Sequence, residues 1–256
     1  MKKICICGGG SLGHVIAGYL SANGKATVSI LTNHPTAWQN KIEICVPDNG
    51  EMLIGNIACV SANPAEALLD AEIVLLCLPG FLIKDELIKI RDFINSGTYV
   101  GSVFSSTGFF FEALKLLNED IPLWGFQRVP FISRIKEYGH SANLLGYKGC
   151  YHIAVERDTD ANKELFRYWV ENSFDRPVTL LKNYLEASLT NSNPLLHTAR
   201  LYSMFHDWQP GISYPRNILF YEEWTEDAAK LLIQMDAEFF TCLLYTSPSP
   251  RDRSLS

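Results

Sequence analysis

Near the N-terminus, residues 3–22 read KICICGGGSLGHVIAGYLSA. The short run Ile4–Cys7 is apolar, as in a buried strand, and it stops at three consecutive glycines. From Leu12 to Ala22, apolar side chains recur at the spacing of one helix face. The segment therefore predicts a strand, a tight glycine turn and a helix that follow one another directly.

The glycines of this turn have a spacing with a known physical basis. Gly8, Gly10 and Gly13 fit the pattern G-x-G-x-x-G, which is specific when a strand precedes it and a helix follows it. The first glycine permits the turn, the second lets a pyrophosphate approach the backbone, and the third lets the helix pack on the strand. We therefore expect a Rossmann-type dinucleotide-binding domain, with Ser11 and Leu12 also at the cofactor. The alternative is a plain glycine turn.

Strand-like and helix-like segments alternate in the residues that follow. We expect further strands at 26–31, 57–60, 71–78 and 99–104, and helices at 64–69 and 82–94. The run 71–78 is apolar almost throughout, which is typical of a strand buried on both faces. It ends at Pro79, which we expect beside the cofactor. Strands that alternate with helices predict an α/β fold with a doubly wound parallel sheet.

The residues after the second predicted strand bear on the choice of cofactor. An acidic residue at this place binds the adenosine ribose hydroxyls of NAD, but the chain has Thr32, Asn33 and His34 there. A carboxylate would repel the 2′-phosphate of NADP, and these side chains would not. We expect NADP as the preferred cofactor, with Thr32 and Asn33 in contact with it. No arginine is present to hold the phosphate, so NAD stays open.

The composition excludes several classes of protein. A net charge of −6 argues against a nucleic-acid-binding surface. No apolar run reaches the about 18 residues that span a bilayer, and glycines interrupt the apolar stretch after Met1, so we expect no signal peptide and a cytoplasmic location. The seven cysteines form no CxxC pair. We expect them to be reduced, with Cys5, Cys7 and Cys77 buried, and we expect no metal site. The sequence is compatible with a homodimer.

Three later segments resemble the opine dehydrogenases, the octopine/nopaline dehydrogenase family. Residues 71–79, AEIVLLCLP, resemble the fourth strand of that family, and 127–134, QRVPFISR, followed by LGYK at 145–148, are similar to the second half of its nucleotide domain. Residues 189–197, LTNSNPLLH, resemble the Asn-Pro-x-x-His motif that opens its helical substrate domain. The resemblance covers residues 1 to about 241. Many members have proline after the motif histidine, where this chain has Thr198.

The resemblance implies a reaction and a division of the chain. The reaction is the NAD(P)H-dependent reductive condensation of an amino acid with a 2-oxo acid, which are then the small-molecule partners. The division is a dinucleotide-binding domain at 1–183 and the first part of an all-α substrate domain at 184–241. A related NAD(P)-dependent dehydrogenase of hydroxy acids is the alternative enzyme, although the lysine that would favour it is absent from the motif. A non-catalytic dinucleotide-binding protein is the alternative from another class.

His197 is the candidate catalytic residue. Asn193 and Pro194 have the residue types of a helix N-cap and a first helical position, which places His197 in the first turn. The positive helix end there keeps the imidazole neutral, so the ring can accept a proton in opine oxidation and return it in synthesis. The alternative is a core or capping histidine. The motif also makes Asn193 a candidate substrate contact, and the resemblance implies a carboxylate from much later in the chain that orients the histidine.

Two arginines are candidates for binding substrate carboxylates. A guanidinium binds a carboxylate through two parallel hydrogen bonds. Arg134 lies in the segment that resembles the family, and Arg200 follows His197 by three residues on the same predicted helix. The alternative for Arg134 is a surface ion pair.

The end of the chain has a different character from the rest. A predicted helix at 225–241 places Ala228, Leu231, Leu232, Met235 and Phe239 on one face. Residues 242–256 then read CLLYTSPSPRDRSLS, and a reverse translation of residues 242–252 resembles a sequencing adapter. We expect this tail to be non-native, the natural sequence to stop near Thr241 and a C-terminal portion of the protein to be missing. The alternative is an ordinary disordered terminus.

Overall fold

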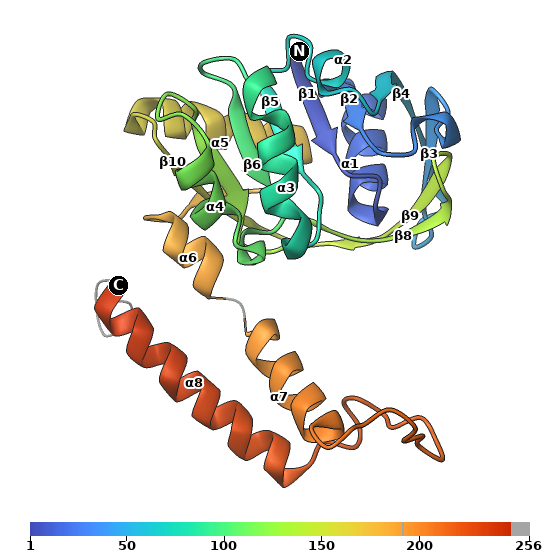
Figure 1. Ribbon diagram of the computed structural model, residues 1–256. Helices are drawn as coiled ribbons and strands as arrows, with labels where there is room; N and C mark the ends of the chain where they lie inside the picture. Colours follow the sequence, from blue (N-terminus) through green and yellow to red (C-terminus); the bar gives the residue numbers. More distant parts are fainter. Residues whose placement is uncertain (191, 247–256) are drawn as a thin grey trace. The chain divides into compact units, whose positions relative to one another are not determined.

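The structure, a computed structural model, describes residues 1–190 and 192–246, with side chains to 241 (Figure 1). The chain forms two compact units, Met1–Thr190 and Asn191–Ser256. The domain border that we expected after residue 183 lies seven residues before this division, which falls after Thr190. Of the predicted non-native tail, residues 247–256 lie outside the described part of the chain.

The first unit is built on one sheet. Its order is β11-β10-β7-β6-β5-β1-β2-β4-β3-β9-β8. The strands are β1 (Lys2–Cys7), β2 (Ala26–Leu31), β3 (Lys41–Val46), β4 (Glu51–Ser61), β5 (Ile73–Leu76), β6 (Tyr99–Ser102), β7 (Leu123–Phe126), β8 (Phe131–Glu137), β9 (Ser141–Tyr147), β10 (Tyr151–Glu156) and β11 (Val178–Leu180). The five strands expected from the sequence are all present, and they lie side by side at the centre.

The expectation of a parallel sheet is confirmed for this centre and for the pairs β3–β9 and β10–β11, and it is wrong for three other pairs. The neighbours from β7 through β6, β5, β1 and β2 to β4 are all parallel. The pairs β3–β4, β8–β9 and β7–β10 are antiparallel. The first two are hairpins with tight turns at 47–50 and 138–140, and two strands joined by so short a connection can pair only antiparallel. The strand predicted at 57–60 corresponds only to the last part of β4, which begins at Glu51.

Helices cover both faces of the sheet, as a doubly wound fold requires (Figure 1). They are α1 (Ser11–Ala22), α2 (Pro64–Ala67), α3 (Gly80–Ile90), α4 (Phe109–Leu116), α5 (Asp160–Phe174) and α6 (Tyr184–Leu189), with 3₁₀ turns η1 (Pro35–Ala37), η2 (Arg91–Phe93) and η3 (Ser105–Thr107). The helix expected at 82–94 is therefore α3 continued by η2.

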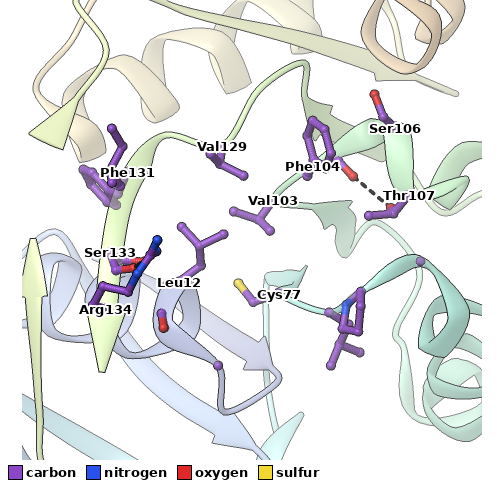
Figure 2. A pocket seen from close by; sticks show the side chains of 16 residues that line it. Leu12, Cys77, Val103, Phe104, Ser106, Thr107, Val129, Phe131, Ser133 and Arg134 are labelled. Atoms are coloured by element: carbon purple, nitrogen blue, oxygen red, sulfur yellow. Dashed lines mark hydrogen bonds between the residues drawn. The ribbon is translucent and has the colours of Figure 1, made fainter. Parts of the chain in front are cut away.

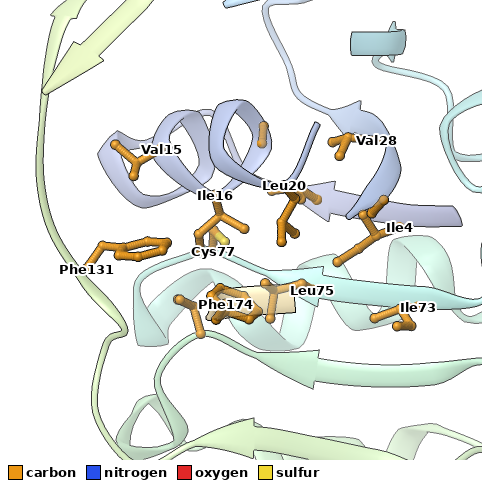
Figure 3. Packing of buried hydrophobic residues seen from close by; sticks show 14 of the residues in the cluster. Ile4, Val15, Ile16, Leu20, Val28, Ile73, Leu75, Cys77, Phe131 and Phe174 are labelled. Atoms are coloured by element: carbon orange, nitrogen blue, oxygen red, sulfur yellow. The ribbon is translucent and has the colours of Figure 1, made fainter. Parts of the chain in front are cut away.

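The core consists of two apolar layers that the central strands share. Ile4 and Ile6 of β1 pack in the layer of α1 and α5, which Figure 3 shows with Val15, Ile16 and Phe174. Cys5 and Cys7 of the same strand face the other layer, with side chains of α3 and α4. Successive side chains of a strand point to opposite faces, so a strand buried on both faces is apolar throughout. Cys5, Cys7 and Cys77 are buried, as expected.

The second unit contains two helices that pack against each other, α7 (Asn193–Phe205) and α8 (Glu226–Thr246). Ala228 is buried, and Leu231, Leu232, Met235 and Phe239 are half-buried on α8, so the predicted apolar face is confirmed. The predicted end of this helix at Thr241 is wrong, because α8 continues to Thr246. Residues 242–245, CLLY, contain no glycine or proline to stop it.

The described residues contain no helix long and apolar enough to cross a membrane. They also contain no group of three His, Cys, Asp or Glu side chains placed to hold a metal ion.

Candidate functional site

The carboxyl ends of the central parallel strands meet at the glycine loop between β1 and α1. Gly8 has a φ of +117°, and a Cβ on it would lie 2.7 Å from the carbonyl oxygen of Cys77. A Cβ on Gly13 would lie 2.2 Å from the carbonyl oxygen of Gly8. Both contacts are far closer than packed atoms allow. The turn and the close packing of helix on strand therefore require these two glycines.

Gly10 differs from Gly8 and Gly13, because nothing in the protein requires it to be a glycine. Its φ of −80° and ψ of −179° are an extended conformation that any residue adopts. A Cβ on Gly10 would meet no atom within 4 Å. Gly10 instead lines a cavity, so the bare backbone faces space that the protein leaves open.

This cavity has a volume of about 690 Å³, within the range of small-molecule and cofactor sites. Its wall is formed by the glycine loop and by the segments that follow β5 and β6, together with β8. It brings together the predicted residues Ser11, Leu12, Pro79 and Arg134. In Figure 2, Leu12 and Cys77 lie near the centre of the view, with Arg134 on one side.

A smaller cavity of about 160 Å³ adjoins the first, and Leu78 lines both. Gly8 and Gly9 form part of its wall, with Thr32, Asn33 and His34 from the end of β2. The remaining side chains come from elements that we did not connect with the site: Glu86 and Lys89 of α3, and Tyr138 of the β8–β9 turn. The predicted residues at the end of β2 thus line the cavity beside the glycine loop.

His14 holds the glycine loop to the β8–β9 turn. The imidazole is fully buried. Its Nε2 accepts a hydrogen bond of 2.8 Å from the backbone N–H of Gly139, so Nδ1 carries the proton and donates to the carbonyl oxygen of Gly10 at 2.9 Å. Its ring centroid lies 4.1 Å from that of Trp38. Burial lowers the pKa of His14, against the opposing effect of the Gly10 carbonyl.

Glu86 and Lys89 form a charged pair in the wall of the smaller cavity. Lys89 Nζ lies 3.8 Å from Glu86 Oε2. Burial raises the pKa of Glu86, while the charge of Lys89 opposes that rise. The pair gives this cavity both a cation and a carboxylate.

Arg134 is exposed on β8 at the edge of the larger cavity. Its Nη1 donates to the carbonyl oxygen of Ser133 at 2.8 Å. Among the residues that the structure describes, no carboxylate lies within ion-pair distance of it. The alternative of a surface ion pair therefore has no partner in this part of the chain.

The helix of the second unit begins one residue earlier than we predicted. Ser192 is the N-cap of α7, so Asn193 and Pro194 are the first two helical residues. His197 is consequently the fifth, beyond the first turn, where the effect of the helix dipole has largely faded. The predicted N-cap at Asn193 is therefore wrong by one residue. His197 is half-buried, and its Nε2 lies 3.1 Å from Tyr221 Oη.

Arg200 is occupied within the second unit. It is 2% exposed, and its Nε donates to the carbonyl oxygen of Phe220 at 2.9 Å. Its guanidinium lies 5.8 Å from the centre of the Trp224 ring. These contacts occupy the guanidinium within the second unit. Asn193 is exposed at the helix start.

Sequence reasoning missed the polar side chains that, besides those at the end of β2, line the smaller cavity or support the glycine loop. They are His14, Glu86, Lys89 and Tyr138. His14 follows Gly10 by one helical turn, a spacing that could have indicated a contact with the loop. Glu86 and Lys89 lie on the helix that follows Pro79, which itself was expected at the cofactor. Tyr138 had no signal in the sequence, since only the sheet pairing brings its turn to the site.

Comparison with known proteins adds an independent line of evidence. Residues 180–244 match the family model described as NAD/NADP octopine/nopaline dehydrogenase, alpha-helical domain. Over 92% of its length the chain is 28% identical to an uncharacterized protein of Sinorhizobium fredii, and over 93% it is 26% identical to the tauropine dehydrogenase of Arabella iricolor. The octopine dehydrogenase of Pecten maximus is 23% identical over 90% of the chain. The chain spans 65%, 64% and 61% of these three relatives, which is less than two thirds of their length.

Solved structures show the same fold. An octopine dehydrogenase solved with NADH and L-arginine matches 97% of this chain and 66% of its own, with a TM-score of 0.80 at 20% identity. A PanE/ApbA family ketopantoate reductase from Ralstonia eutropha matches 77% of the chain and 61% of its own, with a TM-score of 0.57 at 17% identity. The predicted α/β fold of Rossmann type is confirmed.

Proposed function

We propose that this chain is a member of the opine dehydrogenase family and acts as an NAD(P)H-dependent opine dehydrogenase. The reaction joins an amino acid and a 2-oxo acid as an imine, with loss of water, and then reduces the imine to a secondary amine. The observation that carries the proposal is Gly10, whose bare backbone faces an open cavity that its own protein does not fill.

The residues around Gly10 have the chemistry of a dinucleotide site. The first-turn N–H groups of α1 have no partner within the helix, and with the helix dipole they bind phosphate oxygens. Ser11 and Leu12 are in that turn, and Pro79 lies across the cavity from it. The bound dinucleotide supplies a hydride to the imine carbon. The octopine dehydrogenases solved with NADH and the yersinopine dehydrogenase solved with NADP⁺ have this fold.

The substrates need a cation and a proton-transferring group. The amino acid and the 2-oxo acid each carry a carboxylate. Arg134 offers a guanidinium at the cavity edge that no described carboxylate neutralises. His197 is the proposed acid–base residue. As reduction adds a hydride to carbon, the nitrogen takes up a proton, and an imidazole can supply it and later recover it. The Asn-Pro-x-x-His motif supports this role, and Tyr221 Oη is positioned to orient the ring. Asn193, in the same motif, is the proposed second substrate contact.

Of the two cofactors we propose NADP as the preferred one. Thr32, Asn33 and His34 place no carboxylate at the end of β2. The carboxylate in this cavity, Glu86, is paired with Lys89. Titration of the chain with each reduced cofactor, followed by fluorescence, tests the preference. Tighter binding of NADH than of NADPH would refute it.

Turnover with a panel of substrates tests the activity. We expect oxidation of NAD(P)H only when an amino acid and a 2-oxo acid are both present. Oxidation with the 2-oxo acid alone would instead identify a hydroxy-acid dehydrogenase, the alternative that the likeness to ketopantoate reductases favours. Cofactor binding without turnover on any pair would identify a non-catalytic dinucleotide-binding protein.

A further inference from the structure

The smaller cavity contains a charged pair to which the reaction assigns no role. Glu86 and Lys89 come from α3, and residues three apart lie on the same face of a helix. The side chain of Glu86 is 16% exposed and that of Lys89 is 32% exposed. The pair therefore sits in the wall of the cavity and does not project into bulk solvent. The neighbouring charged residues of α3, Lys84 and Asp85, are exposed and line neither cavity.

The position of the pair relates it to one part of a dinucleotide. In a doubly wound sheet the adenosine ribose lies between the glycine loop and the end of the second strand. Gly8, Gly9 and Thr32 line the same small cavity as the pair. A lysine at this place attracts a 2′-phosphate as a point charge. A carboxylate accepts hydrogen bonds from ribose hydroxyls and repels that phosphate.

We propose that Lys89 and Glu86 set the choice between the two cofactors. Lys89 binds the 2′-phosphate of NADPH, and Glu86 accepts a hydrogen bond from the ribose hydroxyls of NADH. The inference rests on the proposed function only in requiring a dinucleotide, and it is independent of the opine chemistry. Lys89 favours NADPH and Glu86 favours NADH, so the pair allows both cofactors to bind. Removal of either charge shifts the preference toward the cofactor that the other residue favours.

Two fragments of the cofactors isolate this end of the molecule. The ligands 2′,5′-ADP and 5′-AMP share the adenosine and differ in the 2′-phosphate. We expect Lys89→Gln to weaken the binding of 2′,5′-ADP by about tenfold or more, the scale of one lost charge-assisted hydrogen bond. The binding of 5′-AMP should change little. Lys84→Gln removes the same charge from an exposed position of the same helix, and it should change neither affinity.

The reciprocal substitution should act in the opposite direction. Glu86→Gln keeps the shape of the side chain and removes its charge. It should tighten the binding of 2′,5′-ADP and weaken that of 5′-AMP, while the control Asp85→Asn leaves both unchanged. Isothermal titration of the whole chain gives these affinities directly, and the melting temperature without ligand shows that each variant is folded.

The outcomes separate this inference from the proposed function. An equal loss of both fragments in Lys89→Gln would overturn the inference, because the lysine would then serve no 2′-phosphate. Failure of the parent chain to bind either fragment would also overturn it, because the cavity would not be an adenosine site. Absence of opine turnover, with the expected fragment affinities, would refute the proposed reaction alone.

Discussion

At the scale of single residues, the three glycines of the loop between β1 and α1 are there for different physical reasons. Gly8 and Gly13 are required by backbone contacts within the protein, whereas a Cβ on Gly10 would point into open space. A sequence motif treats the three alike. The structure separates the two glycines that the fold needs from the one that we assign to the ligand, and this separation makes the assignment testable.

Gly10→Ala should leave the fold intact and weaken cofactor binding. The backbone conformation suits alanine and the methyl group meets no protein atom, but alanine is a poorer N-cap than glycine, so stability should change by no more than about 1 kcal/mol. The same methyl group would enter the space that we assign to the pyrophosphate, and such overpacking costs about 1–3 kcal/mol of binding, or roughly 5- to 150-fold in affinity. Fluorescence titration with NADPH measures it. Gly149→Ala, at a position that is equally open but lines neither cavity, is the matched control. Unchanged affinity in Gly10→Ala would show that the loop binds no dinucleotide.

His197→Ala should separate turnover from binding. General acid–base assistance contributes about 10²- to 10⁴-fold in rate, so we expect the turnover number to fall by about that factor. NADPH affinity should stay the same, because the phosphate site belongs to the glycine loop. His206→Ala replaces an exposed histidine that follows the same helix, and its rate should match that of the parent protein. A parent-like rate in His197→Ala would make the residue structural.

At the scale of elements, the β8–β9 hairpin fixes the start of α1 through His14. Gly139 of its turn has a φ of +72°, and a Cβ there would lie 2.0 Å from the carbonyl oxygen of Ala37. The turn therefore packs directly on the backbone beside Trp38 and presents an N–H group to the buried imidazole. The hairpin and the helix that it fixes are joined by a hydrogen bond across 125 residues of chain.

This contact predicts a dependence of stability on pH. Burial lowers the pKa of His14 in the folded state below the about 6.5 of an unfolded histidine. As the pH falls below about 6.5, the unfolded chain therefore takes up a proton that the folded chain does not, and the folded state loses stability. The loss from one such group is at most about 1.4 kcal/mol per pH unit, and it ends at the folded-state pKa.

Urea unfolding between pH 7.5 and 5, followed by circular dichroism, measures this loss. Stability of the parent chain should be fully present above about pH 6.5 and should decline below it. In His14→Gln the contacts of the imidazole are lost, so the free energy of unfolding should be lower at pH 7.5. Because glutamine cannot take up a proton, the free energy of unfolding of this variant should also depend less on pH. A variant with the same slope as the parent would assign the pH dependence to other groups.

At the scale of the whole molecule, the two compact units give different predictions for ligand binding. The glycine loop and both cavities belong to Met1–Thr190. A ligand that binds only the folded state at 100 times its dissociation constant stabilises that state by about 2.7 kcal/mol. We expect NADPH to slow amide hydrogen exchange in β1, α1 and β2. An equal slowing across α7 and α8, or none in the first unit, would contradict the assignment of the site.

Much of the central fold was predictable because its signals are local. The apolar run of β1, the glycine spacing and the helical period of α1 lie within one stretch of 20 residues, and each reflects short-range geometry. The core strands were also predictable, because burial on both faces leaves an apolar run such as 71–78. The helix start at Asn193 was misplaced by one residue, since Ser192 is an equally good cap and only the backbone conformation distinguishes the two.

The amino-acid sequence alone thus determined the strand–glycine–helix unit, the α/β class and the residues Ser11, Leu12, Thr32 and Pro79 around the loop. The tertiary structure decided what completes the site. Tyr138 reaches it because the β8–β9 hairpin extends the sheet beside β3. Glu86 and Lys89 reach it because α3 packs in the same apolar layer as Cys5 and Cys7 of β1. The physical reason is that periodicity and turn chemistry act over a few residues. Which distant segments form the wall of a cavity depends instead on the pairing and packing of the whole sheet.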